Sequence, residues 1–211
     1  MRIKRIRALG LAAVLVTWSL VAPRLPSRWH PVPHAIVGAA LAALTHAPVG
    51  LRRPGSMSGV RFGLGAAIPV VLGIAVSTAL PRVREEMADR DLPDGALQWL
   101  LLGIPLGTVA SEEAAYRGAL GTVAADAFGP TGGRVVQAAA FGLSHIADAR
   151  STGEPVVPAV LVTGLAGWVL GWLYERSGSL IAPLLAHLAI NEAGAVAALA
   201  VQRIRSAHGQ R

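Results

Sequence analysis

Long apolar stretches separated by short polar segments run along the whole chain. Seven such stretches stand out: Ala8–Ala22, Val32–Leu51, Phe62–Leu80, Leu97–Leu120, Val135–Ala147, Val156–Tyr174 and Leu180–Val201. Most of them approach the roughly 20 residues that an α-helix needs to cross a hydrocarbon core about 30 Å thick. The pattern predicts an all-α, polytopic membrane helix bundle with about seven spans, seven to eight, that forms one integral membrane domain over residues 1–211.

The first and fifth of these stretches are the weakest predicted spans. Ala8–Ala22 follows the basic segment Met1–Arg7, so it also fits a cleaved signal peptide. We favour an uncleaved span, because no clean A-x-A cleavage site follows it. Val135–Ala147 is short for a span unless the flanking Arg134 and Asp148 reach out to the two interfaces.

The composition supports a membrane protein. Hydrophobic residues make up 53% of the chain, charged residues only 15%, and the mean hydropathy is +0.53. A soluble domain has about a quarter charged residues, so disorder, a collagen-like repeat and an ordinary soluble core are excluded. The absence of cysteine excludes disulfide scaffolds, thiolate zinc sites and cysteine nucleophiles. Lys4 is the single lysine, and this arginine bias indicates a GC-rich bacterial genome and hence the bacterial inner membrane.

The net charge of +7 does not point to a nucleic-acid partner. The arginines lie at the N-terminus, in short connections and near the C-terminus, without a basic helix or interleaved aromatic residues. Such positions are typical of the flanks of membrane spans. The number of basic residues is equal on the two sides of the predicted bundle. The first helix usually sets the orientation. It is preceded by four basic residues, Arg2, Lys4, Arg5 and Arg7, which favour a cytoplasmic N-terminus. This orientation would put the polar site towards the cytoplasm.

Several polar or small residues outside the main motifs have structural interpretations. The mixed-charge segment between Arg82 and Asp94 fits either a short interfacial helix or a solvated loop. The spacing of Gly167 and Gly171 lets neighbouring helices approach closely. His34 and His46 have no carboxylate in their span, so we expect both to be interfacial or packing residues.

Ionisable side chains gather in three of the predicted spans. Each costs at least ~2.5–3.5 kcal/mol at bilayer depth, so each is a functional-site hypothesis. They form the segments Ser111–Arg117, Phe141–His145 and His187–Asn191. These segments define a motif-bearing core over residues 96–201.

The depth of these residues provides a test of whether they meet. The fourth and seventh spans reach one side of the bundle near Leu120 and Leu180. Counted from that side, Glu112, His145 and His187 lie about 7–11 residues in, or ~10–16 Å at the rise of an α-helix. We therefore expect the fourth, fifth and seventh spans to enclose a polar cavity.

Spacing separates the roles of the two adjacent glutamates. Glu113 and Arg117 are i,i+4, with the acid on the N-terminal side, which favours an ion pair within one helix. Glu113 is therefore expected to be structurally committed. Glu112 points about 100° away and has no cation in its own helix, which suits a general base.

His187 and Asn191 are also i,i+4 and share one helical face. They fit either hydrogen-bond donors to a developing oxyanion or ligands of a metal ion. A catalytic zinc needs three protein ligands, which Glu112, His145 and His187 would supply. The residue types leave both interpretations open.

Two neighbours of these motifs are less clear candidates. Ser144 and His145 resemble a catalytic dyad only on paper, because adjacent residues of a helix do not face each other. Glu192 lies deep in its span but about 100° from Asn191. It fits an inner partner of the site and a packing residue equally well.

The three motifs, Glu-Glu-x-x-x-Arg, Phe-x-x-x-His and His-x-x-x-Asn in this order on successive spans, resemble the CPBP family. This family comprises CAAX proteases and bacteriocin-processing (Abi) intramembrane proteases. The resemblance covers about residues 112–191. It implies an α-helical membrane endopeptidase that hydrolyses a peptide bond of a membrane-associated peptide or protein near the membrane surface.

The resemblance also implies roles for the motif residues. Glu112 and His145 would activate the attacking water, His187 and Asn191 would stabilise the oxyanion, and Glu113 with Arg117 would hold the site. The family has been described both as metalloproteases and as metal-independent glutamate proteases. We expect no obligatory zinc, since one carboxylate would otherwise have to act as ligand and as base; zinc is the alternative.

Two other function classes stay open beside the protease. A proton-coupled transporter would use Glu112, Glu113 and the histidines as a relay, but the internal symmetry usual in transporters is missing. A non-catalytic bacteriocin-immunity membrane protein would keep the fold without needing Glu112. The zinc-helix, aspartyl and serine signatures of other intramembrane proteases are absent from the sequence.

Overall fold

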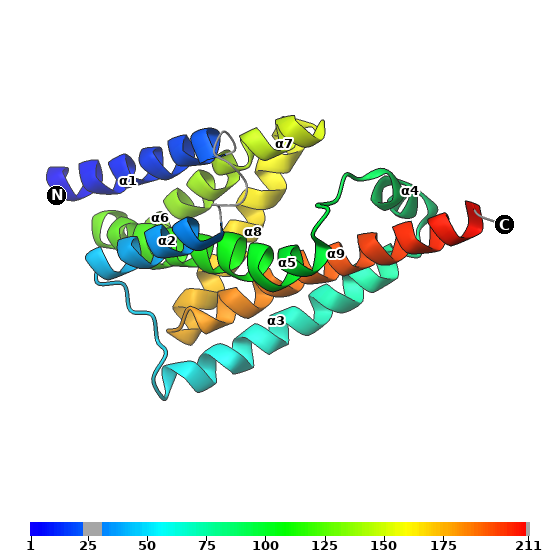
Figure 1. The fold of residues 1–211 in the computed structure, drawn as a ribbon. Helices are drawn as coiled ribbons and strands as arrows, with labels where there is room; N and C mark the ends of the chain where they lie inside the picture. Colours follow the sequence, from blue (N-terminus) through cyan, green and yellow to red (C-terminus); the bar gives the residue numbers. More distant parts are fainter. Residues whose placement is uncertain (23–30, 210–211) are drawn as a thin grey trace.

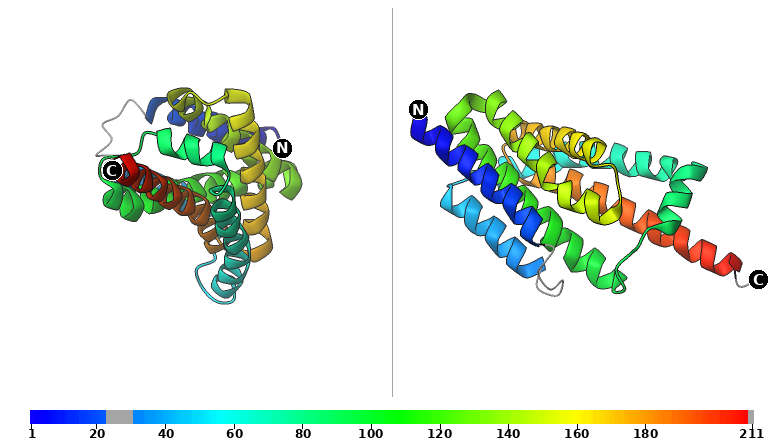
Figure 2. Two further views of the ribbon diagram at one scale, coloured as in Figure 1. Left: turned by 90° about the vertical axis from the view of Figure 1, so that its right-hand side faces the viewer. Right: turned by 90° about the horizontal axis from the view of Figure 1, so that it is seen from above.

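The computed structural model describes residues 1–22 and 31–209, and within these ranges the regular elements are all helical. They form an elongated bundle in which α1 begins at one end and α9 finishes at the other (Figures 1 and 2). The elements are α1 (Arg2–Val21), α2 (Pro31–Leu44), α3 (Gly55–Ser77), α4 (Pro81–Asp89), α5 (Ala96–Gln98), η3 (Trp99–Ala110), η4 (Glu113–Leu120), α6 (Gly121–Ser144), α7 (Ile146–Thr152), α8 (Val156–Ser177) and α9 (Ile181–Gly209).

The predicted all-α membrane bundle is confirmed. Each predicted apolar stretch coincides with a helical segment of the structure. Within the described ranges, three helices are long and apolar enough to cross a membrane: Gly55–Ser77, Val156–Ser177 and Ile181–His208. The apolar helix Pro31–Leu44 is shorter. It ends at Leu44, seven residues before Leu51, where the second stretch was predicted to end.

The predicted connection between the fourth and fifth spans, from Leu120 to Val135, contains the observed break. The chain stays helical beyond Leu120 and leaves the helical conformation at Gly129, with φ 78° and ψ 169°. Pro130 follows and sits in the first turn of the second half of α6, where its missing N–H is tolerated. The connection is helical on both sides of Gly129, so the two helical stretches are longer than hydropathy predicted.

The predicted close approach at Gly167 and Gly171 is confirmed and joins α8 to α6. A Cβ atom on Gly167 would lie 2.9 Å from Cδ1 of Phe141, and one on Gly171 would lie 2.7 Å from Nε2 of Gln137. The Gln137 side chain donates a hydrogen bond of 2.8 Å to the carbonyl oxygen of Gly167. Only glycine permits this contact, which sets Phe141 firmly against α8.

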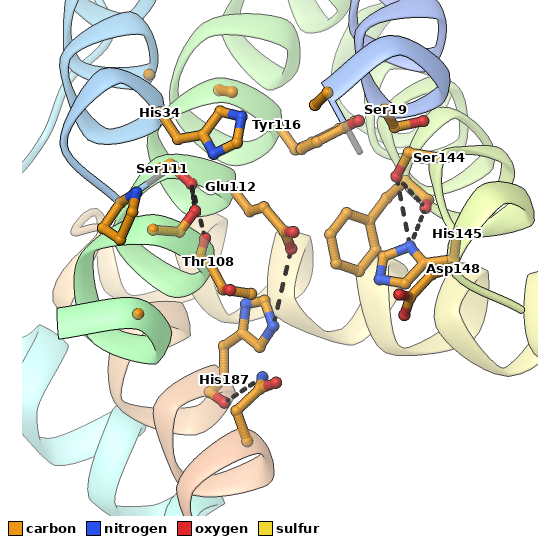
Figure 3. A pocket seen from close by; sticks show the side chains of 18 of the residues that line it. Ser19, His34, Thr108, Ser111, Glu112, Tyr116, Ser144, His145, Asp148 and His187 are labelled. Atoms are coloured by element: carbon orange, nitrogen blue, oxygen red, sulfur yellow. Dashed lines mark hydrogen bonds and ion pairs between the residues drawn. The ribbon is translucent and has the colours of Figure 1, made fainter. Parts of the chain in front are cut away.

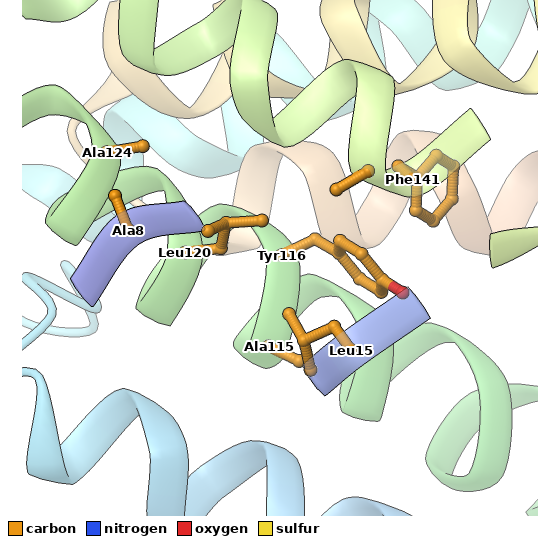
Figure 4. Close-up of a cluster of buried hydrophobic side chains, with 8 residues drawn as sticks. Ala8, Leu15, Ala115, Tyr116, Leu120, Ala124 and Phe141 are labelled. Carbon is orange, nitrogen blue, oxygen red and sulfur yellow. The ribbon is translucent and has the colours of Figure 1, made fainter. Parts of the chain in front are cut away.

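A hydrophobic cluster joins α1, η4 and α6 (Figure 4). Its buried members are Ala8 and Leu15 from α1, Ala115, Tyr116 and Leu120 from η4, and Ala124, Ala140 and Phe141 from α6. Burial of apolar surface contributes roughly 25 cal/mol per Å², so this cluster holds the three helices in place. Tyr116 and Phe141 also border the polar cavity, so the core positions the site directly.

The helix α9 packs along α3 and carries α4 near its C-terminal end (Figure 1). The segment between Arg82 and Asp94, open between a helix and a loop from sequence, includes the helix α4. Gln202 of α9 donates hydrogen bonds to the carbonyl oxygens of Met87 and Arg90, at 3.1 and 2.7 Å. These contacts anchor the far end of the helix that carries His187.

Candidate active site

A cavity of about 1100 Å³ lies between the helices of the core. Its wall includes Glu112, between η3 and η4; His145, at the end of α6; and His187 and Asn191 from α9 (Figure 3). The structure thus brings four of the predicted site residues, from three predicted spans, to one cavity. The other two, Glu113 and Arg117, are fully buried.

The two adjacent glutamates have different surroundings. The Glu112 side chain is 28% exposed and points into the cavity, whereas Glu113 is 0% exposed. They precede and open η4, a π-helical segment, and π-helical turns are frequent at functional sites. The angular separation expected from sequence is therefore observed: one carboxylate faces the cavity and the other faces the protein interior.

Glu113 joins two helices through two charged or polar partners. Its Oε1 lies 3.1 Å from Nη1 of Arg117, as the i,i+4 spacing predicts, and 2.7 Å from Nδ1 of His187. The sequence did not predict the second contact, which links residues 74 positions apart. Because an ionised carboxylate only accepts hydrogen bonds, Nδ1 of His187 donates, and the other ring nitrogen remains for the cavity.

That other nitrogen of His187 faces Glu112. Its Nε2 lies 3.9 Å from Oε2 of Glu112 (Figure 3). His187 therefore lies between two carboxylates, one buried and one accessible from the cavity. Asn191 follows one turn later and also lines the cavity; its Nδ2 donates to the carbonyl oxygen of His187 at 3.2 Å.

His145 lies where the helix breaks between α6 and α7. Its φ of −87° and ψ of 3° depart from helical values. Its Nδ1 lies 2.8 Å from the carbonyl oxygen of Phe141, and since a carbonyl only accepts, Nδ1 carries the hydrogen. The second ring nitrogen, Nε2, is left on the cavity side of the ring (Figure 3).

The expectation that Ser144 and His145 do not meet is wrong. Ser144 Oγ lies 3.3 Å from Nδ1 of His145. The contact arises because α6 ends at Ser144, so the regular helical separation of neighbouring side chains no longer applies. The Ser144 hydroxyl donates to the carbonyl oxygen of Phe141 at 2.7 Å, so it is not arranged as a nucleophile activated by the imidazole.

The ring of Phe141 occupies the centre of the polar side chains. Its centroid lies 4.0 Å from Cζ of Arg117, 4.7 Å from the His145 ring, 5.2 Å from the Tyr116 ring and 6.0 Å from the His187 ring. The aromatic contacts are edge-on, and the guanidinium lies over the face, where the ring is negative. The only sequence signal for these contacts of Phe141 was its i,i+4 spacing from His145.

Two further residues differ in their relation to the cavity. His34, expected only at an interface or in packing, lines the cavity and stacks edge-on with Trp18 at 5.7 Å, because the short helix α2 lies against the site. His46 is exposed in the turn after α2. Glu192 is half-buried, and its buried Oε1 has no hydrogen-bond partner among the described residues. Glu192 is not among the residues that line the cavity.

The predicted zinc ligands are not assembled into a cluster. Among residues 1–22 and 31–209, no group of three or more His, Asp and Glu side chains lies close enough to hold one metal ion. Glu112 and His187 approach each other, whereas His145 and His187 both pack against the Phe141 ring. The residues, as arranged, do not fit a three-ligand zinc site.

Comparison with known families assigns the core of the chain. Residues 94–193 match the family model described as type II CAAX prenyl endopeptidase Rce1-like. Residues 94–193, called the Rce1-like segment below, are therefore similar to this family. The match confirms the resemblance to CAAX proteases, and the segment includes all the predicted site residues. Comparisons with curated proteins and with solved structures found no match.

The Rce1-like segment supplies the polar residues of the cavity but not its whole wall. The helices α1 and α2 precede this segment, yet Trp18 and His34 from them line the cavity. The N-terminal helices therefore complete the chamber around the Rce1-like motifs.

Proposed function

We propose that the protein is an intramembrane endopeptidase that hydrolyses a peptide bond of a membrane-anchored peptide near the membrane surface. The observation that carries the proposal is the Glu112 carboxylate, which faces the cavity and Nε2 of His187 while the adjacent Glu113 is buried in an ion pair. A partly accessible carboxylate that shares a cavity with two imidazoles is suited to general base catalysis.

In the proposed mechanism, Glu112 and His145 act together on the attacking water. His145 donates through Nδ1 to the Phe141 carbonyl, so its Nε2 is available to accept a hydrogen bond from the water. Glu112 takes the second proton as the water oxygen attacks the peptide carbon. The proton then passes from Glu112 to the leaving nitrogen as the C–N bond breaks, which gives a carboxylic acid on one fragment, with the remaining water proton on it, and an amine on the other.

His187 and Asn191 would stabilise the oxyanion that forms. Nδ1 of His187 is occupied by Glu113, so Nε2 can donate to the oxyanion only when the ring is doubly protonated. Two carboxylates flank the ring and Arg117 supplies one positive charge, so a protonated His187 would balance the charges of the group. The second N–H of Asn191 would be the other donor.

We propose that this chemistry needs no metal ion, and zinc content tests the idea. Glu113 is held by Arg117 and His187, and carboxamides such as Asn191 are uncommon zinc ligands. A zinc-bound Glu112 would serve poorly as the base. We expect active protein to contain substoichiometric zinc and to keep its activity after chelation. Stoichiometric zinc, with activity lost on chelation and restored by added metal, would instead make Glu112, His145 and His187 ligands.

The proposed activity can be tested in liposomes that contain the purified protein. The family description makes a farnesylated CAAX peptide the first probe, and a peptide of the same sequence on an apolar transmembrane anchor is the second. Mass spectrometry of the products should show cleavage of one internal peptide bond in at least one probe. Intact probes in vesicles that dissipate an imposed pH gradient would favour a proton-coupled carrier and reject the protease.

We propose the bacterial inner membrane as the location, with the cavity open towards the cytoplasm. The basic residues that precede the apolar part of α1 support this orientation. Cleavage of a probe that is accessible only from the side of the N-terminus would agree with it.

A further inference from the structure

We infer that Ser144 is a positioning residue for the reaction: its hydroxyl oxygen helps to hold the His145 ring so that Nε2 of His145 faces the attacking water. The inference rests on the proposed function, in which His145 orients that water. Ser144 is not one of the defining residues of the three motifs. It lies at the break between α6 and α7.

The hydrogen bonds around Ser144 have one consistent direction. Ser144 Oγ donates its only hydrogen to the Phe141 carbonyl at 2.7 Å, which leaves its lone pairs to accept. Nδ1 of His145 lies 2.8 Å from the same carbonyl and 3.3 Å from Ser144 Oγ. The Nδ1 hydrogen therefore meets two acceptors. A ring turned by 180° about its Cβ–Cγ bond would lose both of them.

The Phe141 ring connects this group to the segment that carries Glu112. Tyr116 lies one turn after Glu112, and its ring packs edge-on against Phe141 at 5.2 Å. The carbonyl oxygen of Phe141 accepts hydrogen bonds from both Ser144 and His145. The group around Ser144 is therefore packed against the segment that carries Glu112.

A purely local role for Ser144 is the competing explanation. A serine hydroxyl commonly donates to the carbonyl three residues earlier, and Ser151 does so to Asp148 at 2.8 Å. Ser144 differs from Ser151 in its contact with an imidazole, at 3.3 Å from Nδ1 of His145. Ser151→Ala is therefore a matched control that removes a similar local bond without disturbing His145.

Activity measurements separate the two explanations. Ser144→Ala is expected to lower kcat about tenfold with KM unchanged, since loss of orientation affects the chemical step. Ser144→Thr keeps the hydroxyl and should restore kcat. Ser151→Ala should match the parent protein.

A second readout does not depend on catalysis. Nitrogen NMR of ¹⁵N-histidine-labelled protein, with His145 assigned by its loss in His145→Gln, reports which ring nitrogen carries the hydrogen. We expect Nδ1–H in the parent protein and a mixture with Nε2–H in Ser144→Ala. If Ser144→Ala unfolds in detergent, Ser144→Cys, whose sulfur is only a weak acceptor, provides the same comparison.

The outcomes are distinguishable from a failure of the protease itself. A parent protein that cleaves neither probe would reject the proposed function, while the NMR result would still report on the ring. A kcat for Ser144→Ala equal to that of Ser151→Ala, or an unchanged hydrogen position at His145, would overturn the positioning role. A change in KM alone would assign Ser144 to substrate binding and would also overturn it.

Discussion

Replacement of Glu112 by glutamine is expected to lower kcat by about 10²–10⁴-fold, the contribution typical of a general base. Glutamine keeps the size and polarity of the side chain but cannot take the proton of the attacking water. The Glu112 side chain is 28% exposed towards the cavity and forms no ion pair within its own helix, so the fold should tolerate the change. Cleavage of the peptide probes and thermal unfolding in detergent measure the two effects separately.

Glu192→Gln is the matched control for this variant. Glu192 is also a carboxylate within an apolar helix, but it does not line the cavity. Its replacement should leave kcat close to that of the parent protein. A fully active Glu112→Gln protein would refute the proposed mechanism, whatever the control shows.

The second large effect is expected on stability. Arg117→Ala should lower the free energy of unfolding by about 3–5 kcal/mol, because it removes one partner of a buried ion pair and strands the other charge. Arg117 and Glu113 are both 0% exposed, and the guanidinium also lies 4.0 Å from the Phe141 ring. Thermal unfolding of the detergent-solubilised protein measures the loss.

An exposed pair with the same i,i+4 spacing provides the control. Arg82 and Glu86 lie 3.3 Å apart with side chains 91% and 69% exposed. Because solvent screens such pairs, Arg82→Ala should change the free energy of unfolding by only about 0–1 kcal/mol. In addition, Glu113→Gln combined with Arg117→Ala should recover part of the stability lost in Arg117→Ala, since the stranded charge is removed. Equal losses at the two ion pairs would contradict the assignment of Arg117 to the buried framework.

Hydropathy was sufficient to locate the helices of this protein. A long apolar segment predicts a membrane helix, because in the bilayer core the backbone polar groups must form their hydrogen bonds within the segment itself. Hydropathy placed a connection between Leu120 and Val135, where the break at Gly129 lies, but it did not show that the chain is helical on both sides of that residue. It also extended the second stretch too far, to Leu51, although α2 ends at Leu44.

Contacts within one helix could be predicted from spacing. The ion pair of Glu113 with Arg117 follows from the geometry of one turn, and so does the separation of Glu112 from Glu113. The close approach of a neighbouring helix at Gly167 was also predicted from sequence, although the structure was needed to identify that helix as α6. These features depend on local geometry that a helix imposes on any sequence.

Contacts between helices needed the folded chain. The hydrogen bond from His187 to Glu113, the place of His34 in the cavity and the contact of Ser144 with His145 each depend on how helices cross or break. Two arrangements of the same apolar helices can satisfy hydropathy equally well while they bring different polar side chains together. The sequence by itself therefore determined the helices, the motif family and the buried ion pair. Only the tertiary structure decided which ring nitrogen faces which carboxylate, because that depends on distances between segments far apart in the chain.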